Sequence, residues 1–255
     1  MRIASAGHAA FAAVMVVLGV VGLVKGDFMP VWQPVPKGVP AREALVVLCA
    51  AVSLASGVGL LSRRVAAHAA RALLACLVLW LLVFRAPPVL RAPTAIVPWD
   101  GAAETAAIVA GAWVLYAWFA SGSFATGEPG LRAARAVYGL AMIPFGLAHF
   151  AYVNETATLV PRWLPAHVGL AYLTGGTFLA AGAAVLTGLA ARLAAALSAV
   201  QMGGFTLLVW VPIVAAGTKD AFQWSEFGIS CALTAAGWVV ADSYRGARWL
   251  ALNRR

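Results

Sequence analysis

The chain has 255 residues, of which 63% are hydrophobic and 11% are charged. An ordinary soluble domain is about 45–50% apolar and about 25% charged, so a soluble fold of this length could not bury so much apolar surface. The sequence therefore predicts an integral membrane protein that is embedded in the lipid bilayer. Its net charge of +9 lies between apolar segments, where membrane topology and anionic headgroups explain it, so no nucleic-acid partner is expected.

Eight apolar segments follow one another, and each approaches the roughly 20 residues that a helix needs to cross a bilayer. Helices are expected because lipid offers backbone polar groups no partner, and because the segments are too long for barrel strands. The expected fold class is all-α, a polytopic transmembrane helical bundle. Its eight spans are predicted at residues 5–24, 43–62, 66–85, 102–120, 132–151, 167–187, 190–213 and 225–242.

A self-similarity with an offset of 125 residues divides the chain into two halves. Apolar identities mean little in so biased a composition, so the comparison depends on the pairs Pro40/Pro165, Pro87/Pro212 and Trp99/Trp224. Before these pairs the offset is 127, as in Pro34/Pro161, and a two-residue difference in the first loop accounts for the change. We therefore expect two tandem four-helix repeats in one orientation, residues 1–124 and residues 125–255.

The distribution of charge predicts the orientation in the membrane. With the N-terminus in the cytoplasm, the inner segments carry more Lys and Arg than the outer ones, and most acidic residues lie outside. The positive-inside rule then places both termini in the cytoplasm, with a basic tail that ends in Arg254 and Arg255. The outer connections are also longer, and long ordered loops tend to be functional. We therefore expect a site at the outer face.

Two segments of the second half carry a family resemblance: Gly146-Leu-Ala-His149-Phe-Ala-Tyr152 and Val160-Pro-Arg-Trp-Leu-Pro165. With the glycine-marked span that follows, they resemble the DoxX-like family of small four-helix membrane proteins of the bacterial inner membrane. The first half is similar to a more divergent copy. Some members are associated with quinone-linked sulfur oxidation and others with oxidative-stress assemblies. The resemblance thus implies a redox-associated subunit with a membrane or periplasmic redox partner, but no family catalytic motif maps onto this chain.

Polar and aromatic residues collect where the outer ends of the second-half spans are expected to meet. The ligand-binding candidates are His149, Tyr152, His167, Trp210, Trp224 and Glu226. Such a group fits a quinone or another lipophilic small molecule, because His and Tyr donate to carbonyl oxygens, a carboxylate relays a proton and Trp stacks. Interfacial anchoring is the alternative. Haem ligation by His149 and His167 is disfavoured, since the first half has Gly22 and Arg42 at the matching positions.

Ionisable residues near membrane depth are costly and are usually paired or functional. The structural ion-pair candidates are Arg42, Glu43, Arg85, Glu104 and Arg162. Arg85 is expected to pair with Glu104 or Glu43, whereas a pair between Arg162 and Glu226 would close the ligand space. Gln201, near the middle of a span, is expected to make an interhelical hydrogen bond. The chain has no CxxC, HExxH or P-loop motif, so no metal site is expected.

The function expected from these features is a redox-associated membrane subunit that binds quinone or another lipophilic molecule near the outer face. A small-molecule carrier and a non-catalytic membrane scaffold or assembly factor remain the alternatives. No residue is assigned a catalytic role.

Overall fold

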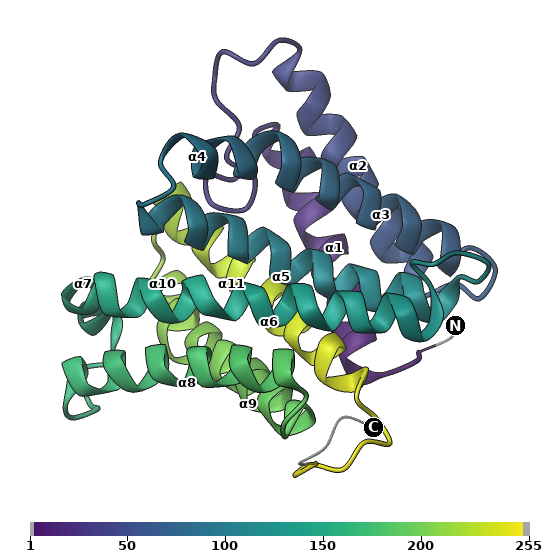
Figure 1. The fold of residues 1–255 in the computed structure, drawn as a ribbon. Coiled ribbons are helices and arrows are strands. Elements are labelled where there is room, and N and C mark those ends of the chain that lie inside the picture. Colours follow the sequence, from purple (N-terminus) through teal and green to yellow (C-terminus); the bar gives the residue numbers. More distant parts are fainter. Residues whose placement is uncertain (1–2, 252–255) are drawn as a thin grey trace.

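The computed structural model describes residues 3–251, which form helices with no strand among them, so the all-α expectation is confirmed for this part of the chain (Figure 1). Arg2, Arg254 and Arg255 fall outside the described residues. The elements are α1 (Ala6–Lys25), α2 (Arg42–Leu60), α3 (Ala66–Trp80), η1 (Leu81–Arg85), α4 (Ala86–Arg91), α5 (Ile96–Phe119), α6 (Gly127–Ala151), α7 (Val153–Leu159), α8 (His167–Thr187), α9 (Ala191–Phe205), η2 (Thr206–Trp210), α10 (Val211–Ala215) and α11 (Ala221–Asp242).

Six of the described helices are long and apolar enough to cross a membrane, which is the architecture of a membrane protein. The run from α3 to α4 is one of them, and the run from α9 to α10 is another. Helix α6 qualifies only together with α7, from which it is bent by 94°, and α11 does not qualify. The expected eight spans are therefore not confirmed. Helix α6 begins with charged residues, and half of the 22 residues of α11 are buried by protein, so neither needs a fully apolar surface.

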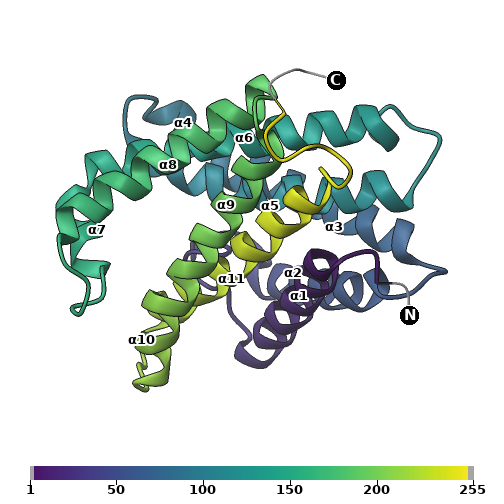
Figure 2. The same ribbon diagram turned by 90° about the horizontal axis from the view of Figure 1, so that it is seen from below.

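The helices pack as a closed ring in which each element contacts the next. The order of contacts is α1, α2, α3, α5, α6, α8, α9 and α11, and α11 returns to α1. Helices α5 and α11 also contact each other across the ring, and both are seen near the centre in Figures 1 and 2. The largest buried cluster lies along these two helices. Because α5 packs against α6, and α1 against α11, the two halves of the sequence share an extensive interface.

Corresponding elements begin 125 residues apart. Helices α2, α3 and α5 and turn η1 begin at residues 42, 66, 96 and 81, whereas α8, α9, α11 and η2 begin at 167, 191, 221 and 206. Ala41 and Ala166, which precede α2 and α8, both adopt left-handed backbone, with φ of 53° and 54°. The Trp99 Nε1–H donates to the carbonyl of residue 93, and the Trp224 Nε1–H to that of residue 218, each at 2.9 Å. The two tryptophans thus make the same local contact.

The π-helical turns η1 and η2 have a cause in the sequence. Each turn ends two residues before a proline, Pro87 or Pro212. Proline has no N–H to donate, and its ring clashes with the carbonyl four residues earlier, so the helix before it widens. Arg85 and Trp210 occupy the last position of the two turns. Trp210 lines the candidate site described below, and Arg85 bonds to Glu104, which also lines it.

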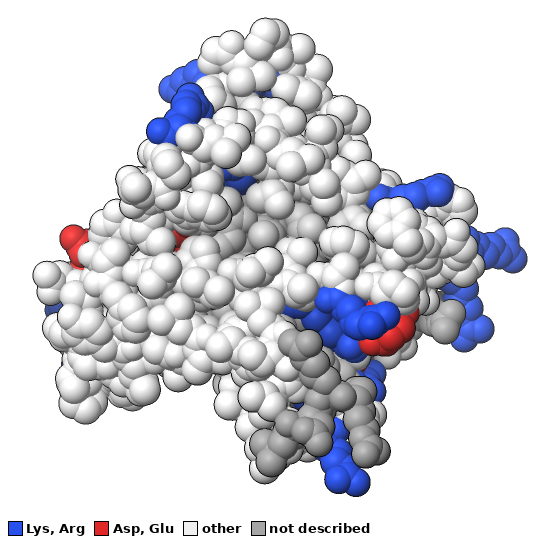
Figure 3. Space-filling model, viewed as in Figure 1, with Lys and Arg blue, Asp and Glu red and all other residues white. Residues whose placement is uncertain are grey.

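The surface agrees with a membrane protein. On the face shown in Figure 3, Lys and Arg gather mainly toward the edges, and the broad area between them is almost free of charge. Large apolar side chains are exposed on the long helices, for example Leu48, Leu79 and Leu173, each about 60% exposed. A protein surface of this kind suits contact with lipid tails.

Candidate functional site

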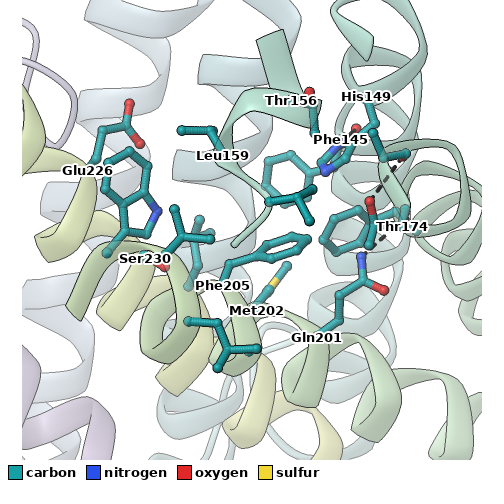
Figure 4. Close-up of a pocket in the computed structure, with 18 of the residues that line it drawn as sticks. Phe145, His149, Thr156, Leu159, Thr174, Gln201, Met202, Phe205, Glu226 and Ser230 are labelled. Atoms are coloured by element: carbon teal, nitrogen blue, oxygen red, sulfur yellow. Dashed lines mark hydrogen bonds between the residues drawn. The ribbon is translucent and has the colours of Figure 1, made fainter. Parts of the chain in front are cut away.

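A cavity of about 410 Å³ lies between α5, α6, α7, α8, α9, η2 and α11. Small-molecule sites typically measure about 300–1,000 Å³ and combine apolar walls with a few polar groups. The walls are mainly leucine and aromatic side chains, and polar groups lie at two opposite ends. Figure 4 shows Glu226 at one end and His149, Thr174 and Gln201 at the other. The cavity therefore fits a molecule that is largely apolar and carries polar groups.

His149, near the C-terminal end of α6, forms part of one end of the cavity. Its ring lies 5.4 Å from the Phe178 ring and 5.9 Å from the Phe205 ring, measured between centroids. Its Nδ1 lies 2.8 Å from the Phe145 carbonyl oxygen. A carbonyl oxygen only accepts, so Nδ1 carries the hydrogen and Nε2 of the neutral ring keeps a lone pair. No hydrogen bond from residues 3–251 reaches Nε2, so this end offers a free acceptor.

Gln201, also at this end, is already engaged. Its Nε2 donates to the Thr174 carbonyl at 3.1 Å, and its Oε1 accepts a hydrogen bond from the Thr177 hydroxyl. The interhelical hydrogen bond expected of Gln201 is confirmed. Because both ends of its amide are used, Gln201 fixes α9 against α8, and the His149 Nε2 remains available to a ligand.

The opposite end of the cavity is acidic. It is formed by Asp100 and Glu104 from α5 and by Glu226 from α11. Glu104 accepts a hydrogen bond from Arg85 at 3.5 Å, and the two side chains are only 15% and 12% exposed. The expected pairing of Arg85 with Glu104 is thus confirmed. Arg85 bonds to only one of the three carboxyl groups, so this end offers carboxyl groups to a polar part of a ligand.

Arg85 also holds the segment between α1 and α2 inside the bundle. Its guanidinium donates to the Val31 carbonyl at 2.5 Å and to the Thr105 hydroxyl at 3.2 Å. Ser225 on α11 is fully buried, and its hydroxyl oxygen accepts the backbone N–H groups of Val31 and Trp32 at 2.8 and 3.0 Å. These bonds satisfy a buried loop backbone and leave Trp32 only 6% exposed.

The structure brings three of the six ligand-binding candidates to the cavity: His149, Trp210 and Glu226. Tyr152 and Trp224 lie at the surface, 40% and 45% exposed, and His167 begins α8 outside the cavity lining. In a continuous helix, Tyr152 would lie on nearly the same face as His149. Helix α6 instead ends at Ala151, and the chain turns by 94° into α7. Tyr152 therefore leaves the face that it would share with His149.

The remaining ion-pair candidates, Arg42, Glu43 and Arg162, do not form the expected pairs in the described residues. Arg42 pairs with Asp27, not with Glu43, and its guanidinium lies over the Phe28 ring at 5.2 Å. Within the described residues, Glu43 and Arg162 form no salt bridge, so no pair between Arg162 and Glu226 closes the cavity. The part of the chain that the structure describes also has no group of three His, Cys, Asp or Glu placed to hold a metal ion.

Sequence reasoning missed two kinds of lining residue. The aromatic walls, such as Phe178 and Phe205, stand in apolar spans where one more apolar residue carries no positional signal. Glu104 is expected only as an ion-pair candidate, and Asp100 precedes the span predicted at residues 102–120. Helix α5 begins earlier, at Ile96, and its central position brings both carboxyl groups to the second-half cavity. Their spacing of four residues, which places both on one helix face, was the available signal.

Comparisons with known proteins find no matching protein family, no similar curated protein and no similar solved structure. A functional conclusion therefore depends on the geometry and chemistry of the cavity.

Proposed function

We propose that the chain is a redox-associated integral membrane protein that binds quinone or another lipophilic small molecule in the cavity described above. The observation that carries the proposal is the cavity itself: about 410 Å³, walled by apolar and aromatic side chains, with polar groups confined to two ends. A ring with polar substituents and an apolar tail matches this distribution.

The proposed architecture is a DoxX-like pair of tandem four-helix units, in which α6 and α11 are the fifth and eighth spans in chain order. Helix starts 125 residues apart and the matching contacts of Trp99 and Trp224 support the duplication. Protein neighbours, not lipid, surround the buried half of α11, which is compatible with a membrane span of modest hydropathy. The excess of Lys and Arg in the inner segments supports cytoplasmic termini.

In this proposal, the chain's own residues bind and orient the ligand. Phe205 and Trp210 form walls, and His149 and Glu226 offer polar groups to the ligand at opposite ends. Electrons reach or leave the ligand through a membrane or periplasmic partner.

The test is to purify the chain in mild detergent, extract it with organic solvent and identify small lipophiles by mass spectrometry. We expect one lipophile in near-stoichiometric amount, lost in His149→Phe but retained in His167→Phe. The second variant is a matched control because His167 lies outside the cavity lining. Melting temperature is followed in both. Recovery of only bulk membrane lipid, or full retention of the lipophile by His149→Phe, would refute the proposal.

Further measurements on the same purified protein distinguish the two alternative functions, a carrier and a scaffold. A carrier moves the extracted lipophile across reconstituted vesicles in a protein-dependent way. A scaffold holds none, and its stability is indifferent to leucine substitutions that fill the cavity.

A further inference from the structure

Trp32 is buried in the first half among residues whose helix positions correspond to positions that line the cavity, although the side chains differ. Beside the Trp32 indole only about 10 Å³ of space is left, and it is lined by Trp32, Gln33, Ser53, Leu73, Cys76, Leu77, Trp80 and Thr105; apart from Trp32 and Gln33, these are the neighbours compared with the cavity. Five of these residues have cavity-lining counterparts 125 positions later, namely Phe178, Gln201, Met202, Phe205 and Ser230. Equivalent helix positions therefore surround a filled space in one half and an open one in the other.

The segment that enters each space accounts for the difference. Trp32 stands two residues before Pro34, and Leu159 stands two residues before Pro161, the proline pair that aligns the two loops. Leu159 also lines the cavity, but it is 45% exposed and ends the short helix α7. Where the first half inserts an indole that is 6% exposed, the second half thus supplies a smaller side chain that remains half outside.

We infer that the cavity takes a flat, bicyclic aromatic ring bearing a hydrogen-bond donor, in the place that the Trp32 indole occupies in the first half. This inference rests on the proposed function and narrows it to a ligand class. The first half serves as an internal template, because the same framework closes around a planar ring with almost no space left. The larger volume of the cavity leaves room for a substituent or chain on that ring.

The walls of the cavity suit such a ring. Phe145, Phe178 and Phe205 form an aromatic cluster with centroid separations of 5.6 and 6.1 Å, and Trp210 lines the same space. Aromatic pairs at about 4.5–7 Å are favourable beyond the area that they bury. A flat aromatic ring in this cluster gains aromatic contacts that a saturated ring of similar size cannot make.

The polar groups of the cavity suit a hydroxyl group, which both donates and accepts. Nε2 of His149 accepts a hydrogen bond, and a carboxyl group at the other end accepts one or, when protonated, also donates one. Quinone carbonyl oxygens only accept, whereas the hydroxyl groups of a quinol or a phenol donate. The cavity chemistry therefore favours the hydroxylated form of a bicyclic ring.

The probe for the test is 2-naphthol, a flat bicyclic ring with one hydroxyl group. Two relatives separate its properties: 2-methoxynaphthalene keeps the ring without the donor, and decahydro-2-naphthol keeps the donor without the flat ring. Binding to the full chain in lipid nanodiscs is measured by equilibrium dialysis against empty nanodiscs. We expect saturable binding of one 2-naphthol per chain and at least tenfold weaker binding of each relative.

The matched variants place a tryptophan inside or outside the cavity. Leu159→Trp introduces the residue that fills the first-half space and is expected to weaken 2-naphthol binding at least tenfold. Leu173→Trp, on the outer surface of α8 and 60% exposed, is expected to leave binding unchanged. As an independent measurement, Trp32→Leu is expected to lower the melting temperature, and added indole to restore part of it. This second variant tests the template even where Leu159→Trp folds poorly.

The outcomes distinguish this inference from the proposed function. If a lipophile copurifies and is lost in His149→Phe, but 2-naphthol binds no better than decahydro-2-naphthol or 2-methoxynaphthalene, the proposed function stands and the ring class is wrong. Unchanged 2-naphthol binding in Leu159→Trp also overturns the inference. If no lipophile copurifies and no probe binds above empty nanodiscs, both are wrong.

Discussion

Gly111 and Ala236 meet where α5 and α11 cross at the centre of the protein. A Cβ atom added to Gly111 would lie 2.8 Å from the Cβ and 2.9 Å from the Cα of Ala236. The two residues are 125 positions apart, the same offset that separates the starts of α5 and α11. A contact between counterparts is the mark of a two-fold relationship, so under the proposed duplication the pseudo-symmetry axis passes through this crossing.

Gly111→Ala is expected to destabilise the protein by about 1–3 kcal/mol, because an added methyl group overpacks a helix crossing that cannot separate without moving the core. The measurement is thermal unfolding in detergent. Gly176→Ala is the matched control, since nothing lies within 4 Å of a Cβ at that helical position. Equal melting temperatures for the two variants would show that α5 and α11 do not cross so closely.

Ser225→Ala removes the oxygen that accepts the backbone N–H groups of Val31 and Trp32. A buried donor left without a partner costs about 1–3 kcal/mol, so we expect a lower melting temperature and faster hydrogen exchange in the loop between α1 and α2. Hydrogen exchange followed by mass spectrometry reads this loop directly. Ser121→Ala, at an exposed position, should change neither quantity. Unaltered exchange in Ser225→Ala would mean that other contacts hold the loop.

The Arg85–Glu104 pair is suited to a double-mutant cycle, because both side chains are mostly buried and lie 3.5 Å apart. Arg85→Met is expected to cost about 3–5 kcal/mol, since it leaves a buried carboxyl group without its cation. Arg85→Met combined with Glu104→Met should cost less than the sum of the single variants. The free energies come from denaturant unfolding in mixed micelles. Strict additivity would indicate that the two groups do not interact.

Cysteine labelling tests whether α6 and α11 cross the membrane. In a chain whose native cysteines are replaced by alanine, Ser121→Cys and Trp163→Cys flank α6, and Lys219→Cys and Arg248→Cys flank α11. Positive-inside topology predicts that an impermeant maleimide added to intact cells labels positions 163 and 219. Positions 121 and 248 should react only after lysis. If both members of a pair were labelled from the same side, the helix between them would not cross the membrane.

The Asp27–Arg42 contact predicts a modest loss of stability in acid. The hydrogen bond from Arg42 is the largest influence on Asp27 and lowers the pKa of this exposed carboxyl group. A carboxyl group with a depressed folded-state pKa contributes stability above its unfolded pKa of about 3.9, and that contribution is lost as the pH falls further. Between about pH 5 and pH 3, the melting temperature of the wild type should therefore fall more than that of Asp27→Asn. Parallel curves would assign the acid sensitivity to other groups.

Composition and local pattern determine much of this protein. An apolar fraction of 63% favours helices that are compatible with lipid. Pro87 and Pro212 determine where two of these helices widen into π turns. The cost of an unpaired charge near membrane depth also made a partner for Arg85 predictable, and Glu104 on the neighbouring helix α5 is that partner. These features depend on backbone sterics and on the cost of unpaired polar groups, which act within a few residues or across neighbouring helices.

The composition of the cavity depends instead on which helices become neighbours. The sequence places Asp100 and Glu104 in the first half, but α5 crosses α11 at Gly111 and brings both carboxyl groups to a second-half cavity. The size of the side chain does not by itself determine that Trp32 is buried in the first half while Leu159 stays half exposed at the cavity. The Trp32 loop is held inward by Ser225 and Arg85 from distant elements, and such contacts arise only when the chain packs. Side-chain identity thus specifies the helices, whereas long-range packing determines which spaces between them remain empty.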